Sequence, residues 1–164
     1  FFGFVYVAVM MSFIYQIREL QNGGEFVVLL FLAAWGNDTL AYCTGMLIGK
    51  HKMSPILSPK KSIEGLIGGI VGAAILGALY GLYLNTYIRF SFNPVTMFPI
   101  VCGLGGAVSV IGDLAASAIK RDSGIKDYGT LIPGHGGILD RFDSIIFIAP
   151  VIYYLTVMIS GGAI

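Results

Sequence analysis

The stretch GLIGGIVGAAILGALYGLYL, from Gly65 to Leu84, contains no charged residue. A helix that crosses a lipid bilayer needs about 20 consecutive apolar residues, and this stretch provides them. Its glycines recur four residues apart, in the pairs Gly65/Gly69, Gly68/Gly72 and Gly77/Gly81. Small residues at this spacing let helix backbones approach closely in lipid. The stretch therefore predicts a membrane helix that packs tightly, either inside one bundle or at the seam of a dimer.

The remainder of the chain has the same apolar character. Of the 164 residues in the whole chain, 56% are apolar and 12% are charged, and the mean hydropathy of the chain is +0.83. A soluble domain carries about 25% charged residues. Apolar runs predict five membrane spans, at about residues 1–17, 26–49, 66–84, 94–118 and 138–159. We predict an all-α fold, a polytopic membrane helix bundle forming one integral-membrane domain over residues 1–164, with loops at about 50–65 and 119–139.

The basic residues are distributed unevenly between the two sides of this predicted bundle. Five spans joined by short turns place alternate loops on opposite sides, and only Arg18 and Arg89 fall on one of them. The other eight of the ten bases fall opposite: Lys50, Lys52, Lys60, Lys61, Lys120, Arg121, Lys126 and Arg141. Such an excess is typical of the cytoplasmic side. We expect these loops to face the cytoplasm, in a bacterial inner membrane or alternatively the endoplasmic reticulum; the net charge of +1 does not indicate a nucleic acid partner.

Two acidic residues fall inside predicted spans. Asp38 precedes Lys50 by 12 positions, and Asp113 precedes Lys120 by seven. A lone charge at such depth costs at least about 2.5–3.5 kcal/mol, so each needs a partner or a water-filled cavity. Both are candidate site residues. The alternative is a hydrogen bond between helices, for which Asp38 has polar neighbours close by in the sequence.

Asp140 and Asp143 are three residues apart at the start of the fifth span. On a helix this spacing places both carboxylates on one face. Together with Asp113 they form a set of oxygen ligands suited to Mg²⁺, which takes one or two carboxylates and keeps positions for phosphate oxygens. The alternative is that both acids only stabilise the amino end of the helix.

Basic and glycine residues surround these acids in the sequence. Four bases are candidate phosphate ligands or, alternatively, anchors for lipid head groups: Lys120, Arg121, Lys126 and Arg141. The turn that contains Gly136 and Gly137 permits close approach of a ligand to the backbone. His135, in the same turn, is a candidate donor to a phosphate or leaving group, or a residue that fixes the loop. The residues thus predict a phosphate-handling site with metal-binding carboxylates at the edge of the membrane.

The stretch SAIKRDSGIKDYGTLIPGHGGILDRFD, from Ser117 to Asp143, resembles the signature of the phosphatidate cytidylyltransferases, or CDP-diacylglycerol synthases. That pattern is S-x-apolar-K-R-x4-K-D-x-small-x2-apolar-P-x-H-G-G-apolar-x-D-R-apolar-D. It is matched at Ser117, Ile119, Lys120, Arg121, Lys126, Asp127, Gly129, Ile132, Pro133, His135, Gly136, Gly137, Ile138, Asp140, Arg141, Phe142 and Asp143. The stretches SPKKSIEG, from Ser58 to Gly65, and NDTLAY, from Asn37 to Tyr42, resemble two further family segments, although Leu40 replaces a small residue.

The resemblance implies an integral-membrane nucleotidyltransferase of phospholipid biosynthesis. It would convert CTP and phosphatidate to CDP-diacylglycerol and pyrophosphate with Mg²⁺, and it would form a homodimer. Because the chain begins at Phe1 inside an apolar run, we expect the preceding spans of the family to be absent from it.

The resemblance also suggests a role for each matching residue. Asp113, Asp140 and Asp143 would bind one metal ion or two, with Lys126 and His135 as further catalytic residues. The CTP or phosphatidate phosphates would contact Lys60, Lys61, Ser117, Lys120, Arg121, Gly136, Gly137 and Arg141. Asp127 would contact the nucleotide, and Asp38 is a further candidate for substrate binding.

Three other functions use some of the same features. A CTP-dependent lipid kinase of the dolichol-kinase kind, acting on a polyprenol, would transfer the γ-phosphate instead. A proton- or ion-coupled transporter would use Asp38 and Asp113 as a relay. A membrane scaffold with a basic lipid-binding patch would leave the acids within the spans unexplained.

Overall fold

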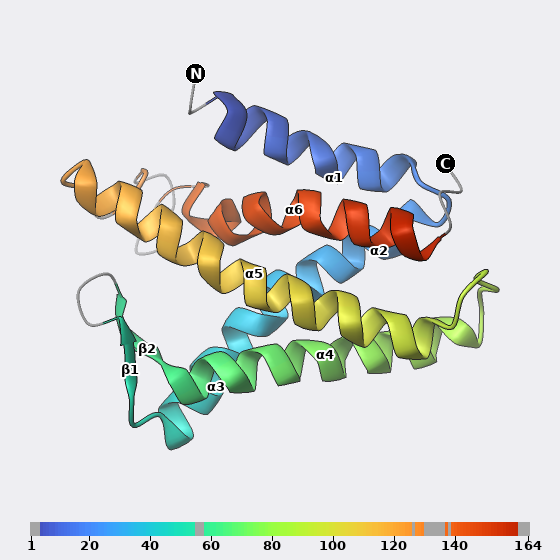
Figure 1. Cartoon of the computed structure of the whole chain (residues 1–164), viewed down its shortest axis with the longest axis horizontal. Helices are drawn as coiled ribbons and strands as arrows, with labels where there is room; N and C mark the ends of the chain where they lie inside the picture. The colour runs from blue at the N-terminus through green and yellow to red at the C-terminus, as the bar shows by residue number, and fades with distance from the viewer. Residues whose placement is uncertain (1–3, 55–57, 126, 130–136, 138, 161–164) are drawn as a thin grey trace.

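The computed structural model describes residues 4–54, 58–125, 127–129, 137 and 139–160. Figure 1 shows long helices that run side by side, with a small hairpin at one end. The helices are α1 (Met10–Glu19), α2 (Gly23–Phe31), α3 (Asn37–Ile48), α4 (Ile63–Asn85), α5 (Pro94–Asp122) and α6 (Leu139–Ile159). π-helical segments precede α1 (Phe4–Val9) and join α2 to α3 (Leu32–Gly36). The hairpin consists of antiparallel strands β1 (Lys52–Ser54) and β2 (Ser58–Ser62).

Four helical segments within the described residues are long and apolar enough to cross a membrane. They are Gly23–Ile48, Ile63–Asn85, Pro94–Asp122 and Phe142–Ile159. These correspond to the last four predicted spans, and the all-α polytopic membrane bundle is confirmed. The first predicted span is helical over Phe4–Glu19 but falls short of that length in the described residues.

The glycines of α4 pack against two neighbouring helices of the same chain. A Cβ atom on Gly77 would lie 2.6 Å from the carbonyl oxygen of Phe98 on α5. A Cβ atom on Gly65 would lie 2.7 Å from the carbonyl oxygen of Ala41 on α3. Only glycine permits such an approach between backbones. The glycine pattern is therefore used inside the bundle, which was one of the two predicted alternatives.

Side-chain caps fix where the two long central helices begin. The Ser62 hydroxyl accepts a hydrogen bond from the Gly65 amide at 3.1 Å, which caps α4 directly after β2. The Asn93 side chain accepts from the Val95 amide at 3.0 Å, and Pro94 occupies the first position of α5. The cap at Ser62 therefore starts α4 at the residue that follows the hairpin.

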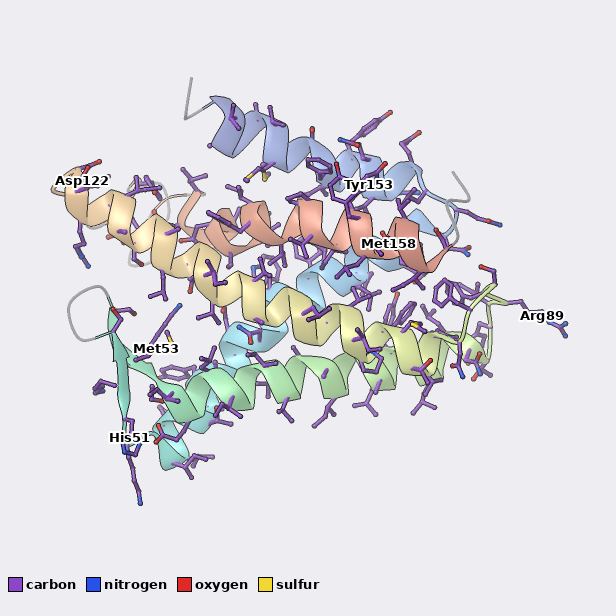
Figure 2. All side chains as sticks on the ribbon, in the orientation of Figure 1. His51, Met53, Arg89, Asp122, Tyr153 and Met158 are labelled. Carbon is purple, nitrogen blue, oxygen red and sulfur yellow. The ribbon has the colours of Figure 1, made fainter. Side chains whose placement is uncertain are left out.

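The two ends of the bundle differ in what they carry. The hairpin, the carboxyl end of α5 and the amino end of α6 lie at one end, and the α4–α5 turn lies at the other (Figure 1). Figure 2 shows His51, Met53 and Asp122 at the first end and Arg89 at the second. The signature residues that the structure describes on α5 and α6 are therefore gathered at the hairpin end.

Candidate functional site

A cavity of about 870 Å³ opens at the hairpin end of the bundle. Its wall comes from α3, the hairpin, the start of α4, α5 and the start of α6. Charged residues from all these elements except α4 line it: Asp38, Lys52, Lys61, Asp113, Asp140 and Asp143. Four acids that are scattered over more than 100 positions in the sequence thus line one cavity, as the sequence analysis predicted for three of them.

Lys120, near the end of α5, contacts both acids at the start of α6. Its Nζ atom lies 2.9 Å from Oδ1 of Asp140 and 3.6 Å from Oδ2 of Asp143. The Lys120 side chain is only 12% exposed. The prediction that Asp140 and Asp143 lie on one helix face is confirmed, because one ammonium group reaches both.

Asp140 also organises the loop that precedes α6. Its Oδ2 atom accepts hydrogen bonds from the backbone amides of Tyr128 and Gly137, each at 2.9 Å. Burial alone would raise the pKa of Asp140, but the Lys120 ammonium and these two amides outweigh it and hold the pKa below its ordinary value. Asp140 is therefore a carboxylate at neutral pH, and both of its oxygens have partners.

Asp113 forms the second charged cluster of the cavity. Its Oδ2 atom pairs with Nζ of Lys61 on β2. On its other side, its carboxyl group lies within hydrogen-bonding reach of the Asp143 carboxyl group. Asp113 and Asp143 are thus a carboxyl pair on neighbouring helices, flanked by Lys61 on one side and Lys120 on the other.

Asp38 also lines the cavity, at the start of α3. Lys61, Asp113 and Ser144 are near its carboxyl group, and the Asn37 amide nitrogen lies 3.4 Å from its Oδ1 atom. The π-helical segment Leu32–Gly36 directly precedes α3, and such segments are frequent at functional sites. The sequence analysis predicted that Asp38 needs either a polar partner or a water-filled cavity. The structure shows polar groups near its carboxyl group and places it on the cavity wall.

The other predicted site residues fall into three groups. Ser117 is half-buried on α5, whereas Asp127 and Arg121 are exposed, and Arg121 donates to the Ile125 carbonyl oxygen at 3.5 Å. Gly137 is buried and contributes its amide to Asp140. Lys126, His135 and Gly136 lie outside the described residues, as do the side chains of Lys60 and Arg141, whose backbones belong to β2 and α6. The roles predicted for all of these residues stay predictions.

The acids of the cavity fit a magnesium ion in part. Within the residues that the structure describes, no group of three His, Cys, Asp or Glu residues is placed to hold one ion. Mg²⁺ needs only one or two protein carboxylates when phosphate oxygens and water complete its shell. The Asp113–Asp143 pair meets that need, while the oxygens of Asp140 are engaged by Lys120 and two amides. Asp140 as a third ligand stays a prediction.

Three residues at the site were missed by the sequence analysis. Tyr128 donates its amide to Asp140, Ser144 lines the cavity beside Asp143, and Asn37 lines it beside Asp38. Asn37 is fully buried, and within the described structure its Oδ1 atom has no hydrogen-bond partner. Each is adjacent in sequence to an acid that was predicted to be in the site, and this adjacency is the feature from which it could have been predicted.

Comparison with known proteins places these residues in a family context. The family model described as "Cytidylyltransferase family" matches residues 1–159. A phosphatidate cytidylyltransferase of Staphylococcus saprophyticus is 36% identical over 154 residues, covering 94% of this chain and 56% of that protein. One from Staphylococcus aureus is 40% identical over 152 residues, covering 93% and 56%. The chain thus spans about half the length of these curated relatives.

Proposed function

Because this chain belongs to the cytidylyltransferase family, we propose that it forms the catalytic region of a membrane enzyme that makes CDP-diacylglycerol and pyrophosphate from CTP and phosphatidate. The observation that carries this proposal is the Asp113–Asp143 pair on the wall of the hairpin-end cavity, with Lys61 beside Asp113 and Lys120 beside Asp143. Two carboxyl groups between two ammonium groups can bind a metal ion and phosphates together. The relatives named phosphatidate cytidylyltransferase support the choice of substrates.

The reaction is the attack of one anion on another, and this determines what the residues must do. An oxygen of the phosphatidate phosphate forms a bond to the α-phosphorus of CTP. The bond between that phosphorus and the oxygen bridging to the β-phosphate breaks, and its electron pair leaves with pyrophosphate. No proton has to be removed from the nucleophile, because the lipid phosphate is already ionised. Catalysis therefore depends on neutralising charge and aligning the reactants.

The residues of the cavity are suited to those two tasks. Asp113 and Asp143 would hold Mg²⁺, and a second ion is compatible with the same proposal. When bound, Mg²⁺ supplies positive charge to the triphosphate oxygens. Lys61 contacts Asp113 and Lys120 contacts Asp143, so each lysine would be close to phosphates that reach these acids. In this proposal Lys60, Arg121, Lys126, Arg141 and His135 contact the phosphates, Asp127 the nucleotide, and Ser117, Gly136, Gly137 and Asp38 the bound substrates.

The proposal includes the side of the membrane on which the site lies. Lys50 and Lys52 flank the start of the hairpin, and Lys120 and Arg121 end α5 at the same end of the bundle. An excess of bases favours the cytoplasmic side, and the relatives named above are bacterial. We therefore place the site at the cytoplasmic face of a bacterial inner membrane, where CTP reaches it from water.

A homodimer is the last part of the proposal. It is supported by the resemblance to the family alone, because the α4 glycines pack against α3 and α5 of the same chain. A dimer would have to use other surfaces of the bundle.

The deciding experiment follows the α- and γ-phosphates of CTP separately. Purified full-length protein in detergent is given Mg²⁺, phosphatidate and CTP labelled on either the α- or the γ-phosphate. We expect the α label in the lipid and the γ label in pyrophosphate. Transfer of the γ label to the lipid would instead indicate a lipid kinase, and transfer of neither label would contradict both activities.

A further inference from the structure

Tyr128 contacts the charged cluster of the cavity through three different groups. Its backbone amide donates to Asp140 Oδ2 at 2.9 Å. Its hydroxyl group donates to the carbonyl oxygen of Ala116 on α5 at 3.3 Å. The centre of its ring lies 5.1 Å from Nζ of Lys120. One residue of the connection between α5 and α6 therefore touches α6 through Asp140 and α5 through Ala116 and Lys120.

The aromatic ring lies close enough to the Lys120 ammonium group to restrict its position. A lysine side chain is flexible and loses conformational entropy when it is held in one position. An ammonium group within about 6 Å of a ring centre is attracted to the face of that ring, and the attraction grows when water is excluded. The same ammonium group contacts Asp140 and Asp143, and the Lys120 side chain is only 12% exposed, so the ring and the carboxylates together leave little of it open to water.

The hydroxyl group has a separate task. Ala116 and Lys120 are four residues apart on α5, so the Tyr128 hydroxyl reaches the helix one turn before the lysine. A tyrosine hydroxyl group is protonated at neutral pH and can therefore donate this hydrogen bond. This contact fixes the ring along the helix, while the amide bond to Asp140 fixes its backbone.

We propose that Tyr128 is a positioning residue whose ring holds the Lys120 ammonium group against Asp140 and Asp143. Its contribution to turnover rests on the function proposed above, whereas its effect on Lys120 does not. Neither Tyr128 nor Lys120 is among the described residues that line the cavity. Lys120 contacts two acids that do line it, Asp140 and Asp143, so Tyr128 acts on the cavity through Lys120 and these acids. A residue that only anchored the loop would need its amide and its hydroxyl group but not an aromatic face.

The test separates the ring from the hydroxyl group. Tyr128→Phe keeps the ring and removes the contact with Ala116, and Tyr128→Leu removes both. Tyr87→Leu is the matched control, because Tyr87 is 71% exposed in the α4–α5 turn at the opposite end of the bundle. The first readout is the rate at which Lys120 is acetylated in the full-length, nucleotide-free protein, measured by mass spectrometry relative to the exposed Lys52.

We expect Lys120 to react about five-fold faster relative to Lys52 in Tyr128→Leu, a change of the size of one cation–π contact. Tyr128→Phe should stay within about two-fold of the wild type, as should Tyr87→Leu. Equal Lys120 reactivity in the wild type and Tyr128→Leu would overturn the proposal. A Tyr128→Phe variant whose Lys120 reacts about five-fold faster than that of the wild type would also overturn it, and this comparison with the wild type is available even where Tyr128→Leu does not fold.

The second readout is the kinetics of cytidylyl transfer. A Lys120 ammonium group that is no longer held in place should lower kcat about ten-fold in Tyr128→Leu, with rescue in Tyr128→Phe and little change in the KM for phosphatidate. An unchanged kcat together with raised Lys120 reactivity would overturn the catalytic part alone. If the wild type transfers no cytidylyl group, the proposed function fails, while the acetylation rates still decide whether Tyr128 positions Lys120.

Discussion

Lys61 on β2 forms an ion pair with Asp113 on α5, which lies 52 residues further along the chain. This pair connects the hairpin to the membrane-spanning helix that carries the central acid of the cavity. Both side chains are partly exposed, so the pair is accessible from the cavity. The hairpin is therefore part of the site, and Lys61 on it is one of the two lysines that form ion pairs with acids among the described residues.

Replacing Lys61 with methionine should lower kcat/KM for CTP about ten-fold or more. Asp113 would lose its ammonium partner, and the bound phosphates would lose one of the positive charges that contact them. Lys61→Arg keeps the charge and should retain more activity. In a double-mutant cycle, Lys61→Met and Asp113→Asn should be strongly non-additive, since each removes the same pair. Additive losses would show that the two side chains act independently.

Replacing Asp143 with asparagine should lower turnover about 100-fold or more while the protein stays folded. The change keeps the shape of the side chain but removes the charge next to Asp113 and Lys120. Initial rates of label transfer from CTP, together with thermal melting in detergent, measure the two effects. Asp122→Asn, at the exposed end of α5 (Figure 2), is the control and should keep full activity. Activity near the wild-type level in Asp143→Asn would exclude the metal-binding role.

Much of the fold could be predicted because a membrane span is recognised from one continuous run of apolar residues. The apolar runs gave the last four spans to within a few residues, and the glycine spacing of α4 predicted its close packing. The three-residue spacing of Asp140 and Asp143 predicted their common face, which the contact of both with Lys120 confirms. Each of these features depends only on helix geometry.

The parts that could not be predicted depend on tertiary contacts. The strands β1 and β2 contain lysine, serine and proline rather than alternating apolar residues, so no strand pattern marked them. The sequence showed many charges near the site but not which of them pair. Lys120 was expected to contact phosphates directly, and its contacts with Asp140 and Asp143 arise only once α5 and α6 pack together.

Replacing Gly77 with alanine should destabilise the bundle by about 1–3 kcal/mol, because the new methyl group would lie 2.6 Å from the Phe98 carbonyl oxygen. A backbone atom cannot yield as a flexible side chain can, so α4 and α5 would have to separate. Gly103→Ala is the matched control on α5, since its methyl group would meet only Ala74 Cβ, at 3.6 Å. Melting temperatures in the same detergent compare the two variants. Equal melting temperatures would mean that the α4–α5 contact is looser than described.

Removing divalent metal with a chelator should abolish cytidylyl transfer, and added Mg²⁺ should restore it. If Asp113 is one of the two metal-binding carboxylates, Asp113→Asn should raise the Mg²⁺ concentration that gives half-maximal activity about ten-fold or more. Glu19→Gln, at the carboxyl end of α1, removes a carboxylate outside the cavity and should leave that concentration unchanged. A magnesium titration of initial rates at saturating CTP measures the shift. The same half-maximal concentration in Asp113→Asn and the wild type would show that Asp113 serves only as the partner of Lys61, and the metal would then have to be held by other residues.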